Sequence, residues 1–597
     1  MNKVRNFSII AHIDHGKTTL TDRLLQLTKT LTPAMAKQER VMDSNPIEQE
    51  RGITIKLAPV RMKYVSTSDG QEYLLHLIDT PGHVDFSYEV SRALTACEGV
   101  VLVVDATQGV QAQTLSHYYQ AQKLNLAVIP VINKIDYPTA DIEKTSLELM
   151  ELCHVTEDKI IAVSAKTGEN VPRLLEEIVQ KIPPPSGDVG GAPRGLMITS
   201  YYHSHQGAIA LVRVVDGEFR ARQTVRLLGA KSEFVAPEVG YFSPEMVPTE
   251  VLKTGEVGYI ATGLKDVRKL TVGDTLTTAK VNQDVQPLSG YQPPKPFVFL
   301  EIYPVDSADF PNLKEAIYKL VLRDAALTYT PTQSQALGSG FQMGFLGLLH
   351  AEVVLERLDR EFDLSIIATT PTVEYRVFLK NGQTEIISSP VKLPDPSLID
   401  YIEEPWVEIS IYTPPQFFHD CMTLVQKHRG QYKMSQNVAE QTKIVCSLPL
   451  AELIVQFHDQ LKSATSGFAS FEYQIVGYQR AEIVRVDILI NKELIEAFSF
   501  MCLAEEVEAK GRILTEKLKE HLPRQMFAIA IQACVGGKVI AREDLQAYRK
   551  DVTAKLYGGD VTRRKKLLAK QAKGKKRMKQ FGKINVDQDL FLKILRQ

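Results

Sequence analysis

Residues 11–18 read Ala-His-Ile-Asp-His-Gly-Lys-Thr, between an apolar stretch that ends at Ile10 and a segment with helical spacing. This arrangement carries the phosphate-binding pattern G-x-x-x-x-G-K-[ST], with Ala11 in place of the first glycine. Gly16 permits a tight turn that points backbone N–H groups at phosphate oxygens, and the helix N-terminus adds a favourable dipole. Lys17 can reach the β- and γ-phosphates, and the Thr18 hydroxyl can bind Mg²⁺. The loop predicts an α/β domain with a mainly parallel sheet.

A second segment, Asp79-Thr-Pro-Gly82, follows the apolar stretch 73–78. An aspartate at a strand end is where such enzymes hold Mg²⁺, usually through water, and the Gly82 N–H can bond the γ-phosphate. Between the two segments lies Arg51-Gly-Ile-Thr-Ile55, where a mobile switch is expected. Its Thr54 is the predicted second hydroxyl ligand of Mg²⁺, so the predicted metal ligands are Thr18, Thr54 and Asp79.

Two further segments predict a guanine pocket. Asn133-Lys134-Ile-Asp136 ends the buried stretch 127–132, and Asp136 can accept hydrogen bonds from the guanine N1–H and exocyclic amine. Ser164-Ala-Lys166 ends a third apolar stretch, where backbone N–H groups could bond the guanine oxygen. Any one segment alone is most simply a polar turn, but five in this order predict a GTPase that binds GTP or GDP with Mg²⁺. The predicted nucleotide-binding residues are Asp14, His15, Gly16, Lys17, Thr18, Thr19, Gly82, Asn133, Lys134, Asp136, Ser164, Ala165 and Lys166.

His83 is the predicted catalytic residue. Phosphoryl transfer to water needs a water molecule placed in line with the leaving group, and the side chain directly after Gly82 is well sited for this. The alternative is an ordinary surface histidine after a turn. No residue of this domain suggests a built-in arginine finger, that is, an arginine that stabilises the transition state. We therefore expect slow intrinsic GTP turnover and an external activator that raises the rate by about 10³–10⁵-fold.

Length and composition limit the remaining possibilities. A chain of 597 residues predicts roughly four domains, and 44% hydrophobic and 24% charged residues are ordinary for globular proteins. No apolar run approaches the ~20 residues of a membrane span. Because the first strand is predicted so close to Met1, we expect no leader peptide. Six cysteines without a C-x-x-C pair favour a reducing cytosol, so we expect a cytoplasmic protein.

The chain after the first domain divides at two Pro/Gly-rich segments, 182–195 and 292–296. Short alternating strands between them, such as 208–215 and 257–261, predict a β-barrel. Two stretches then show the order β-α-β-β-α-β of ferredoxin-like domains. We therefore expect a multidomain α/β and α+β protein with the following ranges: a P-loop GTPase domain (1–185), a β-barrel (195–290), two ferredoxin-like domains (292–372 and 404–482) and a basic C-terminal α+β domain (484–597). The segment 344–350 in the first ferredoxin-like domain is expected to be core.

The C-terminal range predicts a charged helix (505–521), a strand (527–531), a hairpin at Gly536-Gly537 and a second helix from Ala541. From Arg563 to Lys583 the chain has eleven Lys and Arg residues and no Asp or Glu, although its overall net charge is −1. We call residues 563–583 the basic tract. Nucleic-acid phosphate is its expected partner, with an anionic membrane or a merely solvated tail as alternatives.

The strings HIDHGKT, RGITI and DTPGH resemble those of translational GTPases. That resemblance implies that His83 orients the attacking water and that Ile13 and Ile53 form an apolar gate. The order of domains is similar to elongation factor G, but only a few dozen residues stand where its extra domain would be inserted. Strings throughout the chain resemble elongation factor 4, the LepA family: G-F-L-G-L-L-H (344–350), P-R-Q (523–525), G-G-K-V-I-A-R (536–542), Y-G-G-D-V (557–561) and G-K-K-R-M-K-Q (574–580).

The resemblance implies a bacterial, ribosome-dependent GTPase that back-translocates tRNA or rescues improperly translocated ribosomes. It also implies contacts with rRNA, ribosomal proteins and, through the C-terminal domain, tRNA, together with peripheral association with an anionic inner membrane. A monomer is expected, since no sustained heptads appear. Two places depart from the family pattern, His203 and Leu503-Ala-Glu505, and leave a diverged paralogue open. Three alternatives are kept: a GTP-timed binding protein for ribosome assembly or a membrane, a translocase like elongation factor G, and a protein that binds free RNA.

Overall fold

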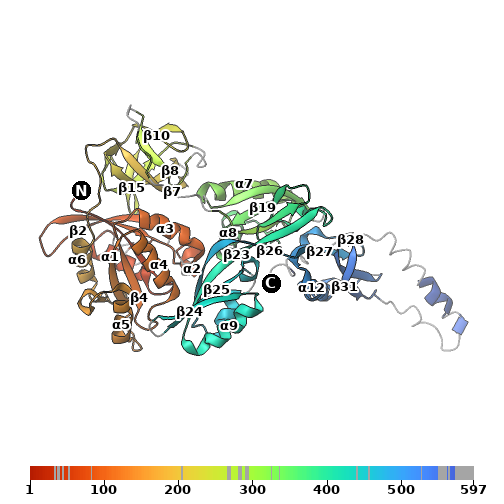
Figure 1. Ribbon diagram of the computed structural model, residues 1–597. Coiled ribbons are helices and arrows are strands. Elements are labelled where there is room, and N and C mark those ends of the chain that lie inside the picture. The colour runs from red at the N-terminus through yellow and green to blue at the C-terminus, as the bar shows by residue number, and fades with distance from the viewer. Residues whose placement is uncertain are drawn as a thin grey trace.

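The computed structural model describes the whole chain except residues 33–34, 36–39, 43–45, 52–53, 83, 204–205, 265–269, 280–284, 289–294, 325, 335–336, 439–440, 455–456, 526, 549–560, 563–564, 572–593 and 595–597. Its shape is elongated (Figure 1). The N-terminal α/β part and the barrel lie at one end, two α+β parts lie in the middle, and the C-terminal part lies at the other end. None of the helices in the described residues is both long and apolar enough to cross a membrane.

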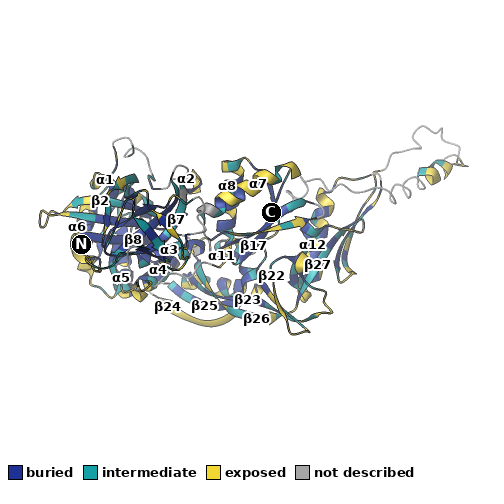
Figure 2. Cartoon of the chain, turned by 90° about the horizontal axis from the view of Figure 1, so that it is seen from above, coloured by how far each residue is buried: buried dark blue, intermediate teal, exposed yellow. Residues whose placement is uncertain are grey.

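The N-terminal part has a six-stranded sheet in the order β2-β3-β1-β4-β5-β6, parallel except for β2. Strand β1 is buried at every position, as expected for a parallel strand covered on both faces. One core lies between the sheet and helices α1 and α6, and a second lies on the side of α3, α4 and α5. Figure 2 shows these strands as a buried layer. The elements are β1 (Val4–Ala11), α1 (Lys17–Leu27), α2 (Pro46–Arg51), β2 (Ala58–Val65), β3 (Glu72–Asp79), the short 3-10 helix η2 (Val84–Phe86), α3 (Ser87–Thr95), β4 (Gly99–Asp105), α4 (Ala112–Lys123), β5 (Ala127–Asn133), α5 (Ile142–Cys153), η3 (Glu157–Lys159), β6 (Ile161–Ala162) and α6 (Val171–Lys181).

The next part is an antiparallel eight-stranded sheet in the order β11-β10-β16-β7-β8-β15-β12-β13, with a small β9–β14 ribbon. One core collects side chains from most of these strands, including Met197, Phe219, Val225, Leu252 and Ile260, as expected for a barrel. The strands are β7 (Arg194–His203), β8 (Gly207–Asp216), β9 (Glu218–Arg220), β10 (Thr224–Leu227), β11 (Glu233–Val235), β12 (Val239–Ser243), β13 (Glu245–Thr249), β14 (Val251–Lys253), β15 (Val257–Ala261) and β16 (Thr275–Thr278).

The first ferredoxin-like part has the sheet order β18-β19-β17-β20, in which the first and third strands of the motif are central. Helices α7 and α8 pack on one face of this sheet. The elements are β17 (Val298–Pro304), η5 (Ser307–Asp309), α7 (Phe310–Arg323), β18 (Thr328–Ser334), β19 (Gly338–Phe345), α8 (Leu348–Phe362) and β20 (Ile366–Ala368).

The second ferredoxin-like part repeats the order as β24-β25-β23-β26 and carries an additional hairpin, β21–β22. This hairpin pairs with the first residues of β23, which begins at Ile399 rather than at the expected Glu404. A β-bulge occurs where β23 passes Trp406, which is 6% exposed. The elements are β21 (Tyr375–Leu379), β22 (Thr384–Ile387), η6 (Pro390–Lys392), β23 (Ile399–Thr413), η7 (Pro415–Phe417), α9 (Phe418–Lys427), β24 (Gln431–Val438), β25 (Gln441–Pro449), α10 (Leu450–Leu453), α11 (Phe457–Ala464) and β26 (Ser470–Ala481).

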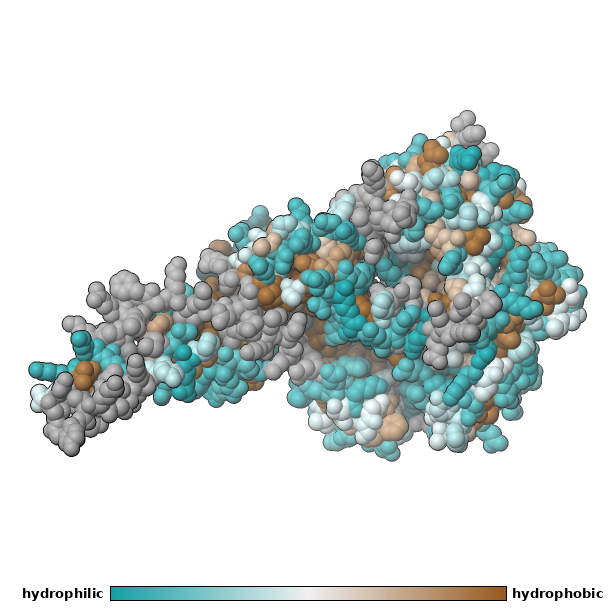
Figure 3. All heavy atoms as spheres, turned by 180° about the vertical axis from the view of Figure 1, so that it is seen from behind, coloured by the Kyte–Doolittle hydropathy of each residue, from teal (hydrophilic) through white to brown (hydrophobic). Residues whose placement is uncertain are grey.

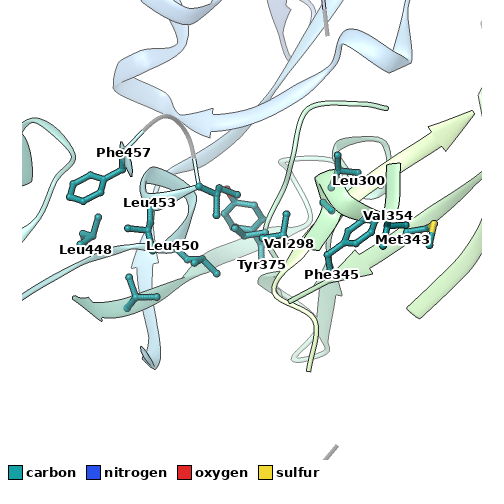
Figure 4. Close-up of a cluster of buried hydrophobic side chains, with 14 of the residues drawn as sticks. Val298, Leu300, Met343, Phe345, Val354, Tyr375, Leu448, Leu450, Leu453 and Phe457 are labelled. Atoms are coloured by element: carbon teal, nitrogen blue, oxygen red, sulfur yellow. The ribbon is translucent and has the colours of Figure 1, made fainter. Parts of the chain in front are cut away.

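The two ferredoxin-like parts share one hydrophobic core (Figure 4). Met343, Phe345 and Val354 lie on one side of the view, and Leu448 and Phe457 lie on the other. Tyr375, the first residue of the hairpin, sits between the two groups and is 4% exposed. The hairpin therefore joins the two parts through its inward-facing residues.

The C-terminal part is a β-sheet with α12 packed on β30 and β31. The predicted second helix from Ala541 is wrong: residues 538–545 form β31, paired with β30. Gly536 and Gly537 both have positive φ values (54° and 83°), as in a type I′ hairpin, and the turn sends the chain back beside β30. The elements are β27 (Ile483–Ile490), β28 (Glu493–Leu494), η8 (Glu496–Phe498), β29 (Phe500–Leu503), η9 (Ala504–Glu506), α12 (Val507–His521), β30 (Ile529–Val535) and β31 (Lys538–Leu545).

The two places expected to depart from the family pattern lie on ordinary elements. His203 ends β7, and Leu503 ends β29 opposite Ile483. Glu505 is exposed in η9, directly before α12. Seen from behind, the surface is mostly hydrophilic, with hydrophobic residues scattered over it (Figure 3).

Candidate nucleotide and hydrolysis site

The phosphate loop joins the end of β1 to the first residue of α1, Lys17. Asp14 and Gly16 adopt positive φ values of 65° and 89°. A side-chain carbon at Gly16 would lie only 2.4 Å from Nδ2 of Asn133. Both the backbone conformation and the lack of space therefore require glycine at this position.

A cavity of about 280 Å³ opens above this loop. It brings together eight of the predicted nucleotide and metal residues from four segments that are separated in sequence. The lining residues are Ala11, His12, Ile13, Asp14, Gly16, Lys17, Thr18, Thr19, Arg40, Thr54, Gly82 and Lys134. Arg40, on the cavity wall, is a residue that sequence analysis missed, because no motif marks it.

Lys17 and Asp79 form an ion pair beside the cavity. The distance from Lys17 Nζ to Asp79 Oδ1 is 3.2 Å, and the Asp79 side chain is fully buried. Neither carboxylate oxygen accepts a hydrogen bond from any described residue. Buried carboxylates are normally hydrogen-bonded, so this one fits a role that involves a further ligand such as hydrated Mg²⁺. The Thr18 and Thr54 side chains, which line the same cavity, add hydroxyl oxygens of the kind that Mg²⁺ binds.

Asn133 ties the phosphate loop to the predicted guanine loops. Its Nδ2 donates to the backbone oxygen of His15 at 3.0 Å, and its Oδ1 accepts from the N–H of Ala165 at 2.9 Å. The residue is 1% exposed. Its side chain therefore positions both loops from beneath, while its neighbour Lys134 lines the cavity.

The guanine loops are further fixed by polar contacts. The hydroxyl of Ser164 donates to Asp136 Oδ1 at 2.7 Å and orients this carboxylate. Lys134 pairs with Asp105 at 2.7 Å. Arg23, a second residue that sequence analysis missed, donates from α1 to the backbone oxygens of Ala165 and Lys166 at 3.1 and 2.5 Å. The role of Arg23 could not be predicted from sequence, because only the tertiary fold brings α1 next to the loop at residues 164–166.

Two histidines of the phosphate loop, His12 and His15, and His117 of α4 are buried, and burial lowers the pKa of each. His15 is fully buried, and its Nδ1 accepts from the backbone N–H of Asp105 at 3.2 Å. Burial lowers the pKa of His15 to about 4. Burial and the charge of Lys17 lower the pKa of His117, on α4, to about 4. The pKa of His12 also lies well below its usual value, first because of burial. All three are therefore neutral at pH 7, and the imidazole of His15 faces the protein interior rather than the cavity.

His83, Gly52 and Ile53 lie outside the described residues. The neighbours of His83 are described: Gly82 lines the cavity, and η2 begins at Val84. The other predicted gate residue, Ile13, also lines the cavity and lies close to Gly82.

The segments on both sides of these positions pack against helix α8. The backbone N–H of Leu349, in the first turn of α8, donates to Asp85 Oδ2 at 2.9 Å. Arg51, at the end of α2, pairs with Glu352 and Glu356 of α8 at 3.1 and 2.7 Å. Apolar residues of both segments and of α8 form a small core at the same interface: Ile47, Ile55, Phe86, Val353 and Leu349. The string 344–350, expected to be core, thus ends at an interface with α2 and η2 of the N-terminal part.

Family models match most of the chain. The elongation factor Tu GTP binding domain matches residues 2–184, and elongation factor Tu domain 2 matches residues 207–277. The elongation factor G C-terminus matches residues 401–489, and the GTP-binding protein LepA C-terminus matches residues 490–596.

Curated relatives match over the full length. The chain is 48% identical over 596 residues to elongation factor 4 of Acetivibrio thermocellus, covering 100% of this chain and 98% of the relative. It is 49% identical over 595 residues to elongation factor 4 of Clostridium acetobutylicum, with coverages of 99% and 98%, and 47% identical over 599 residues to that of Thermus thermophilus, with coverages of 100% and 98%. A crystal structure of a Thermus thermophilus protein shows the same fold at 16% identity, with a TM-score of 0.58, over 81% of this chain and 98% of that one. The chain belongs to the elongation factor 4, or LepA, family.

Proposed function

We propose that the protein is a GTP phosphohydrolase of protein synthesis whose turnover is stimulated by the ribosome. The observation that carries the hydrolysis is the convergence of the phosphate loop, Thr54 and Gly82 on one cavity beside the buried Lys17–Asp79 pair. Full-length similarity to elongation factor 4 supports the ribosomal part.

One group of residues binds the guanine base of GTP, and another binds its phosphates. Asp136, oriented by Ser164, accepts from the guanine N1–H and exocyclic amine, which adenine does not offer in that arrangement. Gly16, Lys17 and the N-terminus of α1 bind the phosphates. Asp79, Thr18 and Thr54 are the residues that would hold Mg²⁺, which would supply charge neutralisation at the phosphate oxygens.

In the reaction, a water oxygen forms a bond to the γ-phosphorus, and the bond from that phosphorus to the β–γ bridging oxygen breaks. GDP and phosphate leave, and the water proton passes to phosphate. His83 is the residue that orients the water, and Ile13 and Ile53 form the gate that controls its approach. Arg40, on the cavity wall, adds a positive charge towards the phosphates.

The ribosomal task that we propose is back-translocation of tRNA or rescue of improperly translocated ribosomes by a cytoplasmic monomer. The basic tract and the match to the LepA C-terminus support contact of the C-terminal domain with tRNA and rRNA. The same positive charges support peripheral association with an anionic membrane.

The first experiment compares GTP turnover with and without 70S ribosomes for the native protein, His83→Ala and Asp136→Asn. We expect stimulation by orders of magnitude, its loss in His83→Ala with GTP still bound, and loss of guanine binding in Asp136→Asn. Tight GTP binding without stimulation would overturn the ribosomal proposal. If His83→Ala stays locked on ribosomes, hydrolysis controls release, which would favour a GTP-timed binding protein; normal release would oppose that alternative.

A further inference from the structure

The outer face of the second ferredoxin-like sheet carries an uncommon set of side chains at one end. Val377 and Ile402 point into the shared core, so the alternate residues of β21 and β23 face away from it. On that outer side lie two arginines and three aromatic rings: Arg376, Phe378, Tyr401, Tyr478 and Arg480. We call these five residues the Arg–aromatic face.

The five side chains form two stacked groups. The guanidinium carbon of Arg376 lies 3.7 Å from the ring centre of Tyr478, and that of Arg480 lies 3.7 Å from the ring centre of Tyr401. The rings of Phe378 and Tyr401 are stacked at 4.3 Å with 15° between their planes. Arg376 extends from β21 to a ring on β26, and Arg480 extends from β26 to a ring on β23. Contact with the ring orients the guanidinium plane of each arginine.

The arginines are held in place without a direct carboxylate partner. Both are exposed, and neither forms an ion pair with any residue that the structure describes. Glu403 lies opposite both of them in register, and the charge of Arg376 also acts on Glu374, two residues away. A guanidinium covered on one side by a ring keeps its other side and its N–H edge for a ligand.

The other end of the same outer face is already occupied within the chain. Tyr412 of β23 is 1% exposed and belongs to the core of the N-terminal α/β part. Glu472 of β26 is hydrogen-bonded by Ser116 of α4. Helix α4 therefore covers one end of β23 and β26, while at the other end the two arginines are exposed and the three rings are half-buried.

We propose that the Arg–aromatic face binds an unpaired RNA segment by stacking bases on the free sides of its ring-backed guanidinium groups and by binding phosphates at their N–H edges. Single-stranded RNA matches this chemistry because every base has a π-face and every nucleotide carries a phosphate for an arginine edge. Other sheets with the order β-α-β-β-α-β bind single-stranded RNA through exposed aromatic side chains. Duplex RNA keeps its bases inside a helix and cannot stack them on a guanidinium plane.

The inference deepens the proposed function by naming unpaired RNA as the partner of this part of the protein, and it rests on that function.

The test uses the full-length protein and a 12-nucleotide single-stranded RNA with 4-thiouridine at a central position. Ultraviolet cross-linking followed by peptide identification locates the bound base, and fluorescence anisotropy gives the affinity. Arg376→Ala with Arg480→Ala removes both guanidinium groups, and Arg376→Lys with Arg480→Lys keeps the charge but not the plane. Arg173→Ala with Arg220→Ala is the control with the same charge change, since both arginines are exposed and lie on α6 and β9, outside the C-terminal part.

We expect cross-links to β21, β23 and β26 in the native protein and in the control. The alanine pair should lose these cross-links and weaken binding about tenfold, and the lysine pair should lose most of the cross-links at an unchanged unfolding temperature. Cross-links confined to the basic tract, equal competition by duplex RNA, or equal affinities of the alanine pair and the control would each overturn the proposal. Ribosome-stimulated turnover of the same preparations shows separately whether the proposed function holds.

Discussion

The carboxylate of Asp85 accepts a hydrogen bond at 2.9 Å from the backbone N–H of Leu349, although 264 residues separate them in the sequence. Asp85 lies in η2, shortly after the position of His83, and Leu349 lies in the first turn of α8. The aspartate therefore satisfies one of the free N–H groups of a helix in another domain and adds a negative charge at its positive end. Asp85 thus connects the segment that follows the γ-phosphate position to the first ferredoxin-like part.

Replacing Asp85 by Ala should cost about 1 kcal/mol of stability, because an N–H group in the first turn of α8 loses its acceptor. We also expect ribosome-stimulated turnover to fall about fivefold while GTP affinity stays unchanged, since the contact lies outside the cavity. The matched control is Asp141→Ala, which removes a helix cap within the N-terminal part. An equal loss of stimulation in the control would show that the effect is only one of stability.

Gly347→Ala should act through the same contact. Gly347 has an extended backbone, so alanine causes no backbone strain, but its side-chain carbon would lie 2.3 Å from Cγ of Asp85. We expect a loss of thermal stability in the native background and a much smaller loss in the Asp85→Ala background, where the obstructing carboxylate is absent. A double-mutant cycle with additive effects would contradict this geometry.

His117→Gln should make stability less dependent on pH. The pKa of His117 is about 4 in the folded protein, because of burial and then Lys17, against 6.5 for a free histidine. The unfolded chain therefore binds a proton that the folded one does not between pH 6.5 and about 4, and stability is lost as the pH falls through this window, by at most about 3 kcal/mol. Thermal midpoints of the variant should fall less steeply than those of the native protein over this range. His458→Gln, at an exposed position, is the control for the substitution itself.

Asn133→Ala should weaken GTP and GDP binding to a similar extent, by at least about tenfold. The substitution removes the acceptor of the Ala165 N–H and the donor to the His15 oxygen, which together hold the phosphate and guanine loops. Fluorescent-nucleotide titrations with both nucleotides provide the measurement. A selective loss of GTP binding would show instead that Asn133 acts towards the γ-phosphate.

The parts of the site that could be predicted from sequence are those marked by local motifs. Four predicted residues lie near strand or helix ends, where the local backbone geometry determines which way they face. All four line the cavity: Gly16, Lys17, Thr18 and Gly82. Arg23, Arg40 and the contact of Asp85 with α8 could not be predicted, because each depends on segments that only the tertiary fold brings together. Their side chains belong to no pattern in their own segment.

The fold shows the same division. The two ferredoxin-like orders are confirmed because each strand and helix has its own periodic apolar pattern. Residues 541–545 were predicted to be helical on local sequence, but pairing with β30 across the Gly536-Gly537 turn makes them a strand. The hairpin β21–β22 was missed because its partner, the first residues of β23, was assigned to the linker between the two domains.

Trp406 is the only tryptophan of the chain, and it is almost completely buried at the bulge of β23. Tryptophan fluorescence of this protein therefore comes from a single place, the sheet of the second ferredoxin-like part. Its emission should be blue-shifted in the native state and move to the red only when that sheet opens. Unfolding of the nucleotide-binding part would be nearly silent in this signal but visible in circular dichroism, so the two spectra together would show which part of the molecule unfolds first.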